Sequence, residues 1–414
     1  MTTASTSRAL APGMPRRGPR RIHPASVMAI GLVLVLAGLL VATLAARGGT
    51  TGHVTTAARP PAATSPASRP EAGRAPRGAA RAPAQRPEQA PAPPGDHSRR
   101  TQRLSPLPPA DGRDAPDPAV VHDGDRWALF STQVGVINVP VAMSNDLREW
   151  AAPVDALPQL PTWADKGRTW APGVLRRATG FVLYFAARSR ALGLQCIGSA
   201  TAEALEGPYS SPAPEPLVCQ PQLGGSIDPQ PFIDSDGTAY LLWKADANAI
   251  GQTSQVFSQA LRPDGLALAG EAMPLLRYDA PWERPLIENP ALLALDGAYV
   301  LLYSGGWWES AGYATGYAVC DTPLGPCAKK TTTQPILAST GDQAGTGGAS
   351  VVTGPADDHW LVHHAWSTGT IGYHAGGARS VHFASLTWDG NQLVIGRRAE
   401  RRPSARAGTA ALLS

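Results

Sequence analysis

Five copies of one short pattern run along this 414-residue chain, and they constrain its fold more than any other feature of the sequence. Each copy has a polar or Pro-marked start, an apolar run, a turn with Asp or Gly, and a second apolar and aromatic run. The copies start at residues 117, 171, 228, 289 and 348, at intervals of 54, 57, 61 and 59 residues. Asp-Gly supplies the positive-φ residues of a tight turn, so each copy predicts two strands joined as a hairpin.

This spacing predicts an all-β, five-bladed β-propeller over residues 106–397. An interval of this length accommodates a four-stranded blade with its loops, and five blades account for nearly the whole segment. Small sheets packed around an axis shorten and protect their edges, which is how such repeats form a closed fold. A β-sandwich with chance similarity between its hairpins is the alternative, and the even spacing of the five copies disfavours it.

The starts of the repeats place three carboxylates where they could meet. The first strand of each propeller blade lines the central channel, so equivalent positions converge on one axis. Asp117 and Asp228 start the first and third copies, and Glu288 immediately precedes Asn289 at the start of the fourth. Clustered acids raise one another's proton affinity, which marks a candidate functional site. Asp-Pro and Asn-Pro also form turns readily, but Glu288 is a poor turn former and interrupts an apolar segment.

The two ends of the chain differ from the repeats. Residues 27–46 carry no charge, and as a helix they would span about 30 Å, the hydrocarbon thickness of a bilayer. The basic segment 1–26 precedes them, so the positive-inside rule predicts a single-pass membrane anchor with the repeats outside the cytoplasm. A cleaved signal peptide is the alternative, and it would give a secreted protein. The composition of residues 47–105 predicts a disordered Pro/Ala/Arg-rich linker, and residues 398–414 predict a disordered tail.

Charge and cysteine content narrow the function further. Residues 1–105 hold 15 Arg and 3 acids, a balance of +12, whereas the whole chain has a net charge of +4, so the rest carries about −8. The repeats therefore give no reason to expect a nucleic-acid site. Four cysteines lie among the repeats, and their spacings match no zinc site. Export favours two disulfides, Cys196–Cys219 and Cys320–Cys327, over four buried thiols.

Several stretches carry a resemblance to a known enzyme family: residues 115–120, 144–150, 169–174, 226–229 with 236–237, and 287–290 with 303–305. In this order and spacing they resemble glycoside hydrolase family 43, in the group of arabinanases, α-L-arabinofuranosidases and β-xylosidases. The resemblance covers about residues 106–395. It implies no redox or organic cofactor.

The resemblance implies a role for each of the three acids. Asp117 matches the general base of the family, Glu288 its general acid, and Asp228 the residue that orients the acid and modulates its pKa. The family inverts anomeric configuration, which requires the base and the acid to stand roughly 6.5–9.5 Å apart with a water between them. The charge of Asp228 would help Glu288 to hold a proton near neutral pH. The family often has Gly or Ala after the acid, and the bulkier Asn289 is expected to narrow the substrate site.

Four further residues are candidates for binding. Trp170 and Trp307 lie near the axis and could stack on a sugar ring, and Arg379 could pair with a catalytic carboxylate. Packing between blades, or a surface position for Arg379, is the alternative for each. The last blade of the family commonly carries a His that supports a metal ion or water in the channel. Residues 345–350 contain none, so His364 is the candidate for holding a structural calcium ion, with a role in the core as the alternative.

Together these observations predict a monomeric, membrane-tethered, inverting hydrolase of pentose-containing glycans, most simply an α-L-arabinofuranosidase or an arabinanase. Its expected partners are a polysaccharide or oligosaccharide substrate and, through residues 27–46, a membrane. Two alternatives stay open. One is a retaining, fructan- or sucrose-type five-bladed hydrolase, and the other is a catalytically inactive propeller that binds glycan.

Overall fold

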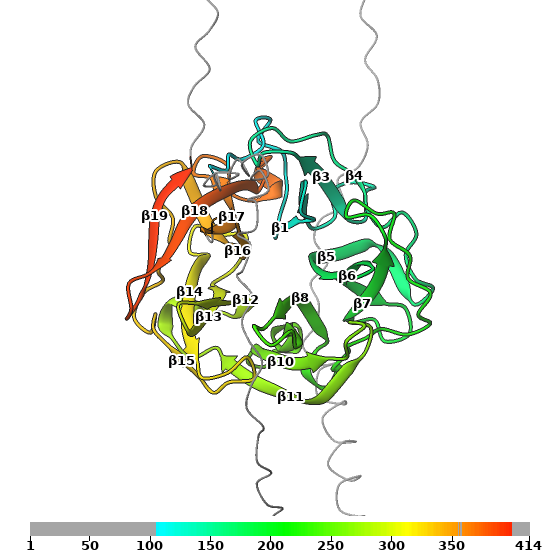
Figure 1. The fold of residues 1–414 in the computed structure, drawn as a ribbon. Coiled ribbons are helices and arrows are strands. Elements are labelled where there is room, and N and C mark those ends of the chain that lie inside the picture. The colour runs from blue at the N-terminus through cyan, green and yellow to red at the C-terminus, as the bar shows by residue number, and fades with distance from the viewer. Residues whose placement is uncertain (1–104, 355, 357, 400–414) are drawn as a thin grey trace, which may run out of the picture. The chain divides into compact units, whose positions relative to one another are not determined.

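The computed structural model describes residues 105–399 except 355 and 357, and these residues form five antiparallel sheets around a central axis (Figure 1). In each sheet the strands follow chain order from the axis outward, with β1, β5, β8, β12 and β16 innermost. Blade 1 consists of β1 (Ala119–His122), β2 (Trp127–Phe130), β3 (Pro140–Ser144) and β4 (Val154–Asp155). Blade 2 consists of β5 (Ala164–Arg177), β6 (Gly180–Ser189) and β7 (Gln195–Ala202). Blade 3 consists of β8 (Ser226–Ile233), β9 (Ala239–Ala245), β10 (Gln255–Leu261) and β11 (Leu268–Arg277). Blade 4 consists of β12 (Ile287–Leu295), β13 (Ala298–Gly305), β14 (Ala314–Cys320) and β15 (Cys327–Lys329). Blade 5 consists of β16 (Gln343–Thr353), β17 (His359–Ser367), β18 (Ser380–Trp388) and β19 (Leu393–Ala399).

The predicted five-bladed propeller is confirmed, with one difference in blade 2. This blade has three strands instead of four. Among the described residues, the segment that follows β7 pairs with it only through two isolated β-bridges, Thr201 with Ser210 and Ile197 with Val218. Between these bridges the sequence carries prolines at 212, 214 and 216. Proline has no backbone N–H to donate to a ladder, so this segment cannot complete a fourth strand.

The same backbone irregularity occurs where each repeat starts. Asp117, Ala171, Asp228, Asn289 and Gly348 all have positive φ, between 42° and 61°. In β5, β8, β12 and β16 this residue also lies at a shift in the strand register, which marks a bulge. A bulge bends the strand and re-aims its side chains. The five repeats are therefore related residue by residue at the axis, and Glu288 stands one residue before the position shared by the other two acids.

Apolar clusters fill the five spaces between successive blades. The last of them joins blade 5 to blade 1, where Val362 and Phe383 pack with Val120 and Trp127. Among the described residues, every strand of blade 5 comes from residues 343–399, so the two blades share no sheet. Side-chain packing and a few hydrogen bonds close the ring instead.

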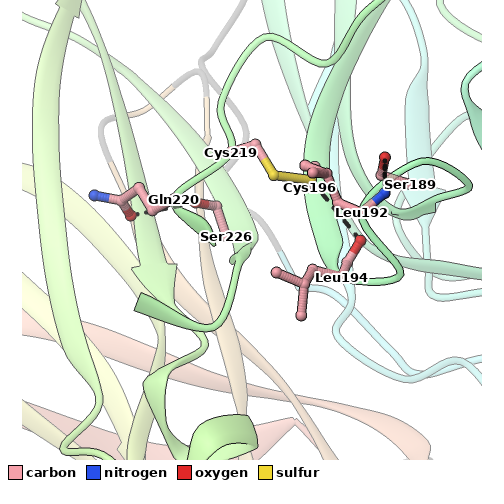
Figure 2. The surroundings of a disulfide bond; sticks show 7 residues. All are labelled: Ser189, Leu192, Leu194, Cys196, Cys219, Gln220 and Ser226. Carbon is pink, nitrogen blue, oxygen red and sulfur yellow. Dashed lines mark hydrogen bonds between the residues drawn. A yellow bond between two sulfur atoms is a disulfide. The ribbon is translucent and has the colours of Figure 1, made fainter. Parts of the chain in front are cut away.

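Both predicted disulfides are confirmed. Cys196 in β7 is bonded to Cys219, which precedes the 3₁₀ turn η1 (Pro221–Leu223), and Figure 2 shows this bond near Gln220 and Ser226. It fastens the end of the proline-rich segment to the blade that this segment fails to extend. Cys320 and Cys327 are directly paired across β14 and β15.

The predictions for the chain ends fall almost wholly outside the described residues. The anchor at 27–46 and the tail beyond residue 399 are not described, and neither is the linker except for residue 105. Strand β19 runs to Ala399, two residues into the predicted tail. The helices of the described part are 3₁₀ turns of three or four residues, η1, η2 (Ala247–Ile250), η3 (Pro281–Glu283) and η4 (Tyr373–Ala375), and none is long enough to cross a bilayer.

Candidate active site

A cavity of about 640 Å³ lies where the inner strands begin, within the size range of ligand sites. Its wall contains all six residues that the sequence proposes for catalysis or substrate binding: Asp117, Asp228, Glu288, Trp170, Trp307 and Arg379. All five blades, through an inner strand or a loop next to one of their strands, contribute these side chains. The start positions of the repeats bring the three acids to one cavity, and loops add Trp307 and Arg379.

The left-handed bulges explain how short acidic side chains reach this cavity. Asp and Asn tolerate positive φ better than most residues. Asp117 and Asp228 therefore occupy this positive-φ position, whereas blades 2 and 5 have Ala171 and Gly348 there. A Cβ on Gly348 would lie 2.3 Å from the His364 ring and 2.9 Å from Asp117 Oδ1, so a side chain at this position would collide with the site.

On one side of the cavity Asp117 is held by three neighbours. Thr132 Oγ1 accepts from the Ala171 N–H at 2.8 Å, and its own proton therefore points to Asp117 Oδ2, 2.6 Å away. The Asp117 N–H donates to His364 Nδ1 at 3.0 Å. Arg379 Nη1 lies 3.9 Å from Asp117 Oδ2, as the sequence suggested. These contacts fix the carboxylate in one orientation.

Arg379 is itself buried and held in place by aromatic rings. Its guanidinium stacks 4.8 Å from the centre of the Trp308 ring and donates to Tyr373 Oη from Nε and Nη2, at 3.2 and 3.0 Å. Burial opposes its charge, but the Asp117 carboxylate and other partners outweigh burial and raise the pKa of Arg379. A permanent positive charge therefore faces Asp117.

On the opposite side Asp228 and Glu288 lie together in a buried environment. Asp228 Oδ2 accepts from the Asn289 N–H at 2.9 Å. Burial, and then the charge of Glu288, raise the pKa of Asp228 well above its ordinary value of 3.8, against the opposing effect of Lys244. Two such carboxyl groups cannot both ionise cheaply, so the pair retains a proton into a higher pH range than separate acids would.

Lys244 is the counter-charge of this pair, and the sequence analysis did not identify it. Its side chain is 1% exposed, and Nζ lies 2.9 Å from Glu288 Oε2 and 3.2 Å from Asp246 Oδ1. Burial lowers its pKa, but the charges of Glu288 and Asp246 prevail and raise it. A signal was present, since Lys244 is the one charged residue within β9.

Tyr313 is the second residue that the sequence did not reveal. It is fully buried, its Oη lies 2.9 Å from Glu288 Oε1 and 2.8 Å from Asn289 Oδ1, and its ring stacks on His364. A Cβ on Gly347 would come within 2.3 Å of this ring, so the Gly-rich start of blade 5 leaves space for it. No local pattern marks Tyr313, because its hydroxyl reaches residues of β12 about 25 positions earlier in the chain and its ring packs on blade 5.

Comparison with known proteins identifies the family. The family model described as glycosyl hydrolases family 43 matches residues 109–393, well over half of the chain. The chain belongs to this family. It is accordingly a glycoside hydrolase, and its predicted family resemblance is confirmed.

Relatives of this family 43 hydrolase are distant. It is 29% identical to a β-D-galactofuranosidase of Aspergillus niger over 49% of this chain, and it spans 58% of that relative. It is 24% identical to an extracellular exo-α-(1→5)-L-arabinofuranosidase of Cellvibrio japonicus over 68% of this chain and 78% of the relative. Among solved structures, a thermostable family-43 glycoside hydrolase matches with a TM-score of 0.63 and 27% identity, over 70% of this chain and 95% of that one.

The ion that the family implies does not suit His364 in this family 43 chain. His364 Nδ1 accepts a backbone N–H, so the neutral ring carries its proton on Nε2 and presents a donor there. Burial, with Arg379 next, keeps its pKa well below 6.5, so the ring is neutral. Nε2 has no hydrogen-bond partner among the described atoms, and no three metal-ligating side chains gather in residues 105–399. Calcium prefers six to eight oxygen ligands; a water oxygen suits this N–H better.

Proposed function

We propose that this family 43 hydrolase cleaves pentose-containing glycans with inversion, as an α-L-arabinofuranosidase or arabinanase. Asp117 acts as the general base, Glu288 as the general acid, and Asp228 as the residue that orients the acid and modulates its pKa. The observation that carries the proposal is the unequal setting of the three carboxyl groups around one cavity. One faces a fixed positive charge, and the other two lie together in a buried setting that raises the pKa of Asp228.

The base side suits activation of water. Thr132 donates to Oδ2 of Asp117, and the guanidinium of Arg379 lies 3.9 Å from the same oxygen. The side chain of Asp117 is 15% exposed, more than that of Glu288 at 10%, so water reaches it from the cavity. A water held by Asp117 can attack the anomeric carbon while the carboxylate takes its proton.

The acid side suits protonation of the leaving oxygen. Asp228 adds negative charge beside Glu288, which favours the protonated state of the pair. Once Glu288 has delivered its proton to the leaving sugar, its carboxylate is paired by Lys244. Departure of the sugar therefore leaves the new Glu288 carboxylate in contact with an ammonium group.

Relatives support a furanoside as the substrate. The two that are named above carry the names of an α-(1→5)-L-arabinofuranosidase and a β-D-galactofuranosidase. Trp170 and Trp307 line the cavity and offer apolar faces to a sugar ring. Because the chain spans only part of the first relative, the substrate of this protein has to be measured directly.

The test uses the purified protein with aryl α-L-arabinofuranoside, β-D-xyloside and β-D-galactofuranoside and with arabinan. We expect the highest kcat/KM for the arabinofuranoside, and NMR of the first product to show the opposite anomer from the substrate. Retention of configuration would reject the inverting mechanism in favour of a retaining fructan- or sucrose-type enzyme. Binding of glycan without cleavage of any substrate would favour an inactive propeller.

We further infer that the enzyme works outside the cytoplasm, held to the membrane by residues 27–46. The two disulfides support this location, because such bonds persist in oxidising compartments. Protease added to intact cells should release an active fragment if the anchor is retained. Activity free in the medium would indicate a cleaved signal peptide, and activity protected inside the cell would contradict export.

A further inference from the structure

We propose that Asn289 and Tyr313 form a hydrogen-bond switch that holds Glu288 in its acid form before the reaction and stabilises its carboxylate afterwards. Both are positioning residues, because they act through Glu288. The inference rests on the proposed role of Glu288 as general acid. It goes beyond that role by assigning a function to the Asn that follows the acid in this chain.

The proton count at Tyr313 carries the argument. Its hydroxyl has one proton, yet Oη lies within hydrogen-bond distance of two oxygens, Glu288 Oε1 at 2.9 Å and Asn289 Oδ1 at 2.8 Å. The amide oxygen only accepts, and an ionised carboxylate only accepts. Both contacts are satisfied together only when Glu288 carries a proton on Oε1 and donates it to Tyr313, while Tyr313 donates to Asn289.

The arrangement changes when Glu288 loses its proton. The Tyr313 hydroxyl can then rotate and donate to the new carboxylate, at the cost of its bond to Asn289. Asn289 thus stabilises only the protonated state, and Tyr313 supports both states. Ser304 lies beside Tyr313, and because its Oγ accepts the Gly348 N–H, its proton can satisfy the second lone pair of Tyr313.

Such a switch counteracts the effect of Lys244, whose positive charge favours the carboxylate form of Glu288. The ionisable groups around Glu288 are Lys244 and Asp246 at the end of β9, Asp228 in β8, Asp117 before β1, and Tyr313 before β14. Lys244, only 2.9 Å away, favours the carboxylate, which is the wrong state for an acid at rest. Asp228 and the Asn289–Tyr313 bond oppose it.

The surrounding structure leaves the switch little freedom except rotation of the hydroxyl. Tyr313 is fully buried and Asn289 is 7% exposed. The backbone N–H of Asn289 is bound to Asp228, and its φ of 48° lies in the region that Asn tolerates well. The ring of Tyr313 is fixed between Gly347 and His364.

The decisive measurement is the pH dependence of kcat/KM, whose basic limb reports loss of the proton from the acid. For Asn289→Gly, which keeps the positive φ, we expect the basic limb to move about one pH unit lower, because the protonated state loses its support. For Tyr313→Phe we expect it to move about one unit higher, because the bond lost by the carboxylate is charge-assisted and stronger than the bond lost by the protonated acid. In the double variant Asn289→Gly has no further effect.

Two controls match these changes. Tyr184→Phe removes a buried hydroxyl that donates to the Gly265 carbonyl, and Asp296→Gly replaces another residue with positive φ, at the far end of the same strand. Neither should move the basic limb. Shifts of equal sign in the two site variants, an unmoved limb in both, or an undiminished effect of Asn289→Gly in the Tyr313→Phe protein would overturn the proposal.

Failure of the switch and failure of the proposed mechanism look different. If Glu288 is not the acid, Glu288→Gln retains full activity, whatever the other variants do. If Glu288 is the acid but the switch is wrong, Glu288→Gln is inactive and the basic limbs of the single variants stay in place. Should Tyr313→Phe not fold, as thermal unfolding would reveal, the shift in Asn289→Gly decides alone.

Discussion

The two sides of the cavity present their carboxylates on the same bulged backbone but surround them differently. Asp117 faces Arg379 and a threonine hydroxyl, and its side chain meets the cavity. Asp228 and Glu288 are more deeply buried and crowd each other, and Glu288 pairs with the Lys244 ammonium group. The comparison teaches that pseudo-symmetry sets the positions of the acids, whereas neighbours outside the repeat pattern set their protonation.

The largest loss of activity is expected when the base is removed, which tests the role of the Asp117 side of the cavity. Asp117→Asn should lower kcat/KM by about 10³- to 10⁴-fold, since the attacking water loses its proton acceptor. The loss should be the same for good and poor leaving groups, because attack needs the base in either case. Steady-state rates with a series of aryl glycosides check this, and a loss confined to poor leaving groups would contradict the role of Asp117.

Removal of the acid should give an effect that depends on the substrate. Glu288→Gln should lower kcat/KM by about 10³-fold for a sugar leaving group, because that oxygen departs only when protonated. A dinitrophenyl leaving group departs without help, so its rate should fall far less. The same series of aryl glycosides measures the dependence on the leaving group. An identical response of Asp117→Asn and Glu288→Gln would contradict the separate roles of base and acid.

Loss of the counter-charge should destabilise the buried side. Lys244→Met leaves Glu288 and Asp246 without their ammonium partner, and we expect a loss of about 3 kcal/mol in the free energy of unfolding near neutral pH. Urea denaturation measures this. Lys329→Met is the matched control, because Lys329 pairs with the fully buried Glu283 away from the cavity. It should lose comparable stability but keep its activity per folded molecule, and loss of activity in both variants would point to general disorder.

The smallest expected effect is a change in the pH dependence of stability. The pKa of Asp228 is raised in the folded state, so above its ordinary value of 3.8 the folded protein holds more protons than the unfolded chain, and Asp228 costs stability as pH rises toward the folded pKa. Asp228→Asn removes this cost and should gain stability relative to the wild type from pH 4 to pH 8.

Asp389→Asn is the control of opposite sign. Backbone N–H groups of Gln392 and then Asn391 lower the pKa of the Asp389 carboxyl. Its stabilisation is present above its ordinary pKa and is lost as pH falls through the folded value, so this variant should lose stability relative to the wild type as pH rises. Thermal unfolding at several pH values compares the two variants, and a gain for both would contradict the assignment of Asp228.

Sequence reasoning reached the fold and the positions of the acids because both are encoded locally. Each hairpin has its own turn residues and apolar runs, and the interval between copies gives the number of blades. Asp117, Asp228 and Glu288 could be placed together because equivalent positions must converge on an axis. The missing fourth strand of blade 2 was also readable in principle from its prolines.

The side chains that surround the acids could not be predicted from the sequence in the same way. Lys244 approaches Glu288 from the neighbouring blade, so their contact depends on how two sheets pack. Tyr313 reaches Glu288 from the start of β14, two strands away in the same sheet. The proton on His364 is decided by a backbone N–H from the other end of the chain. The repeat pattern of the sequence does not predict these contacts between residues far apart in the chain.

Because blades 5 and 1 close the ring, the active site is assembled in a fixed order during synthesis. Asp117 leaves the ribosome long before His364 and Arg379, which orient it. A nascent chain can therefore have four finished blades and all three acids while Asp117 has no fixed orientation. Catalytic competence arrives in a single late event, when the final sheet docks against the first.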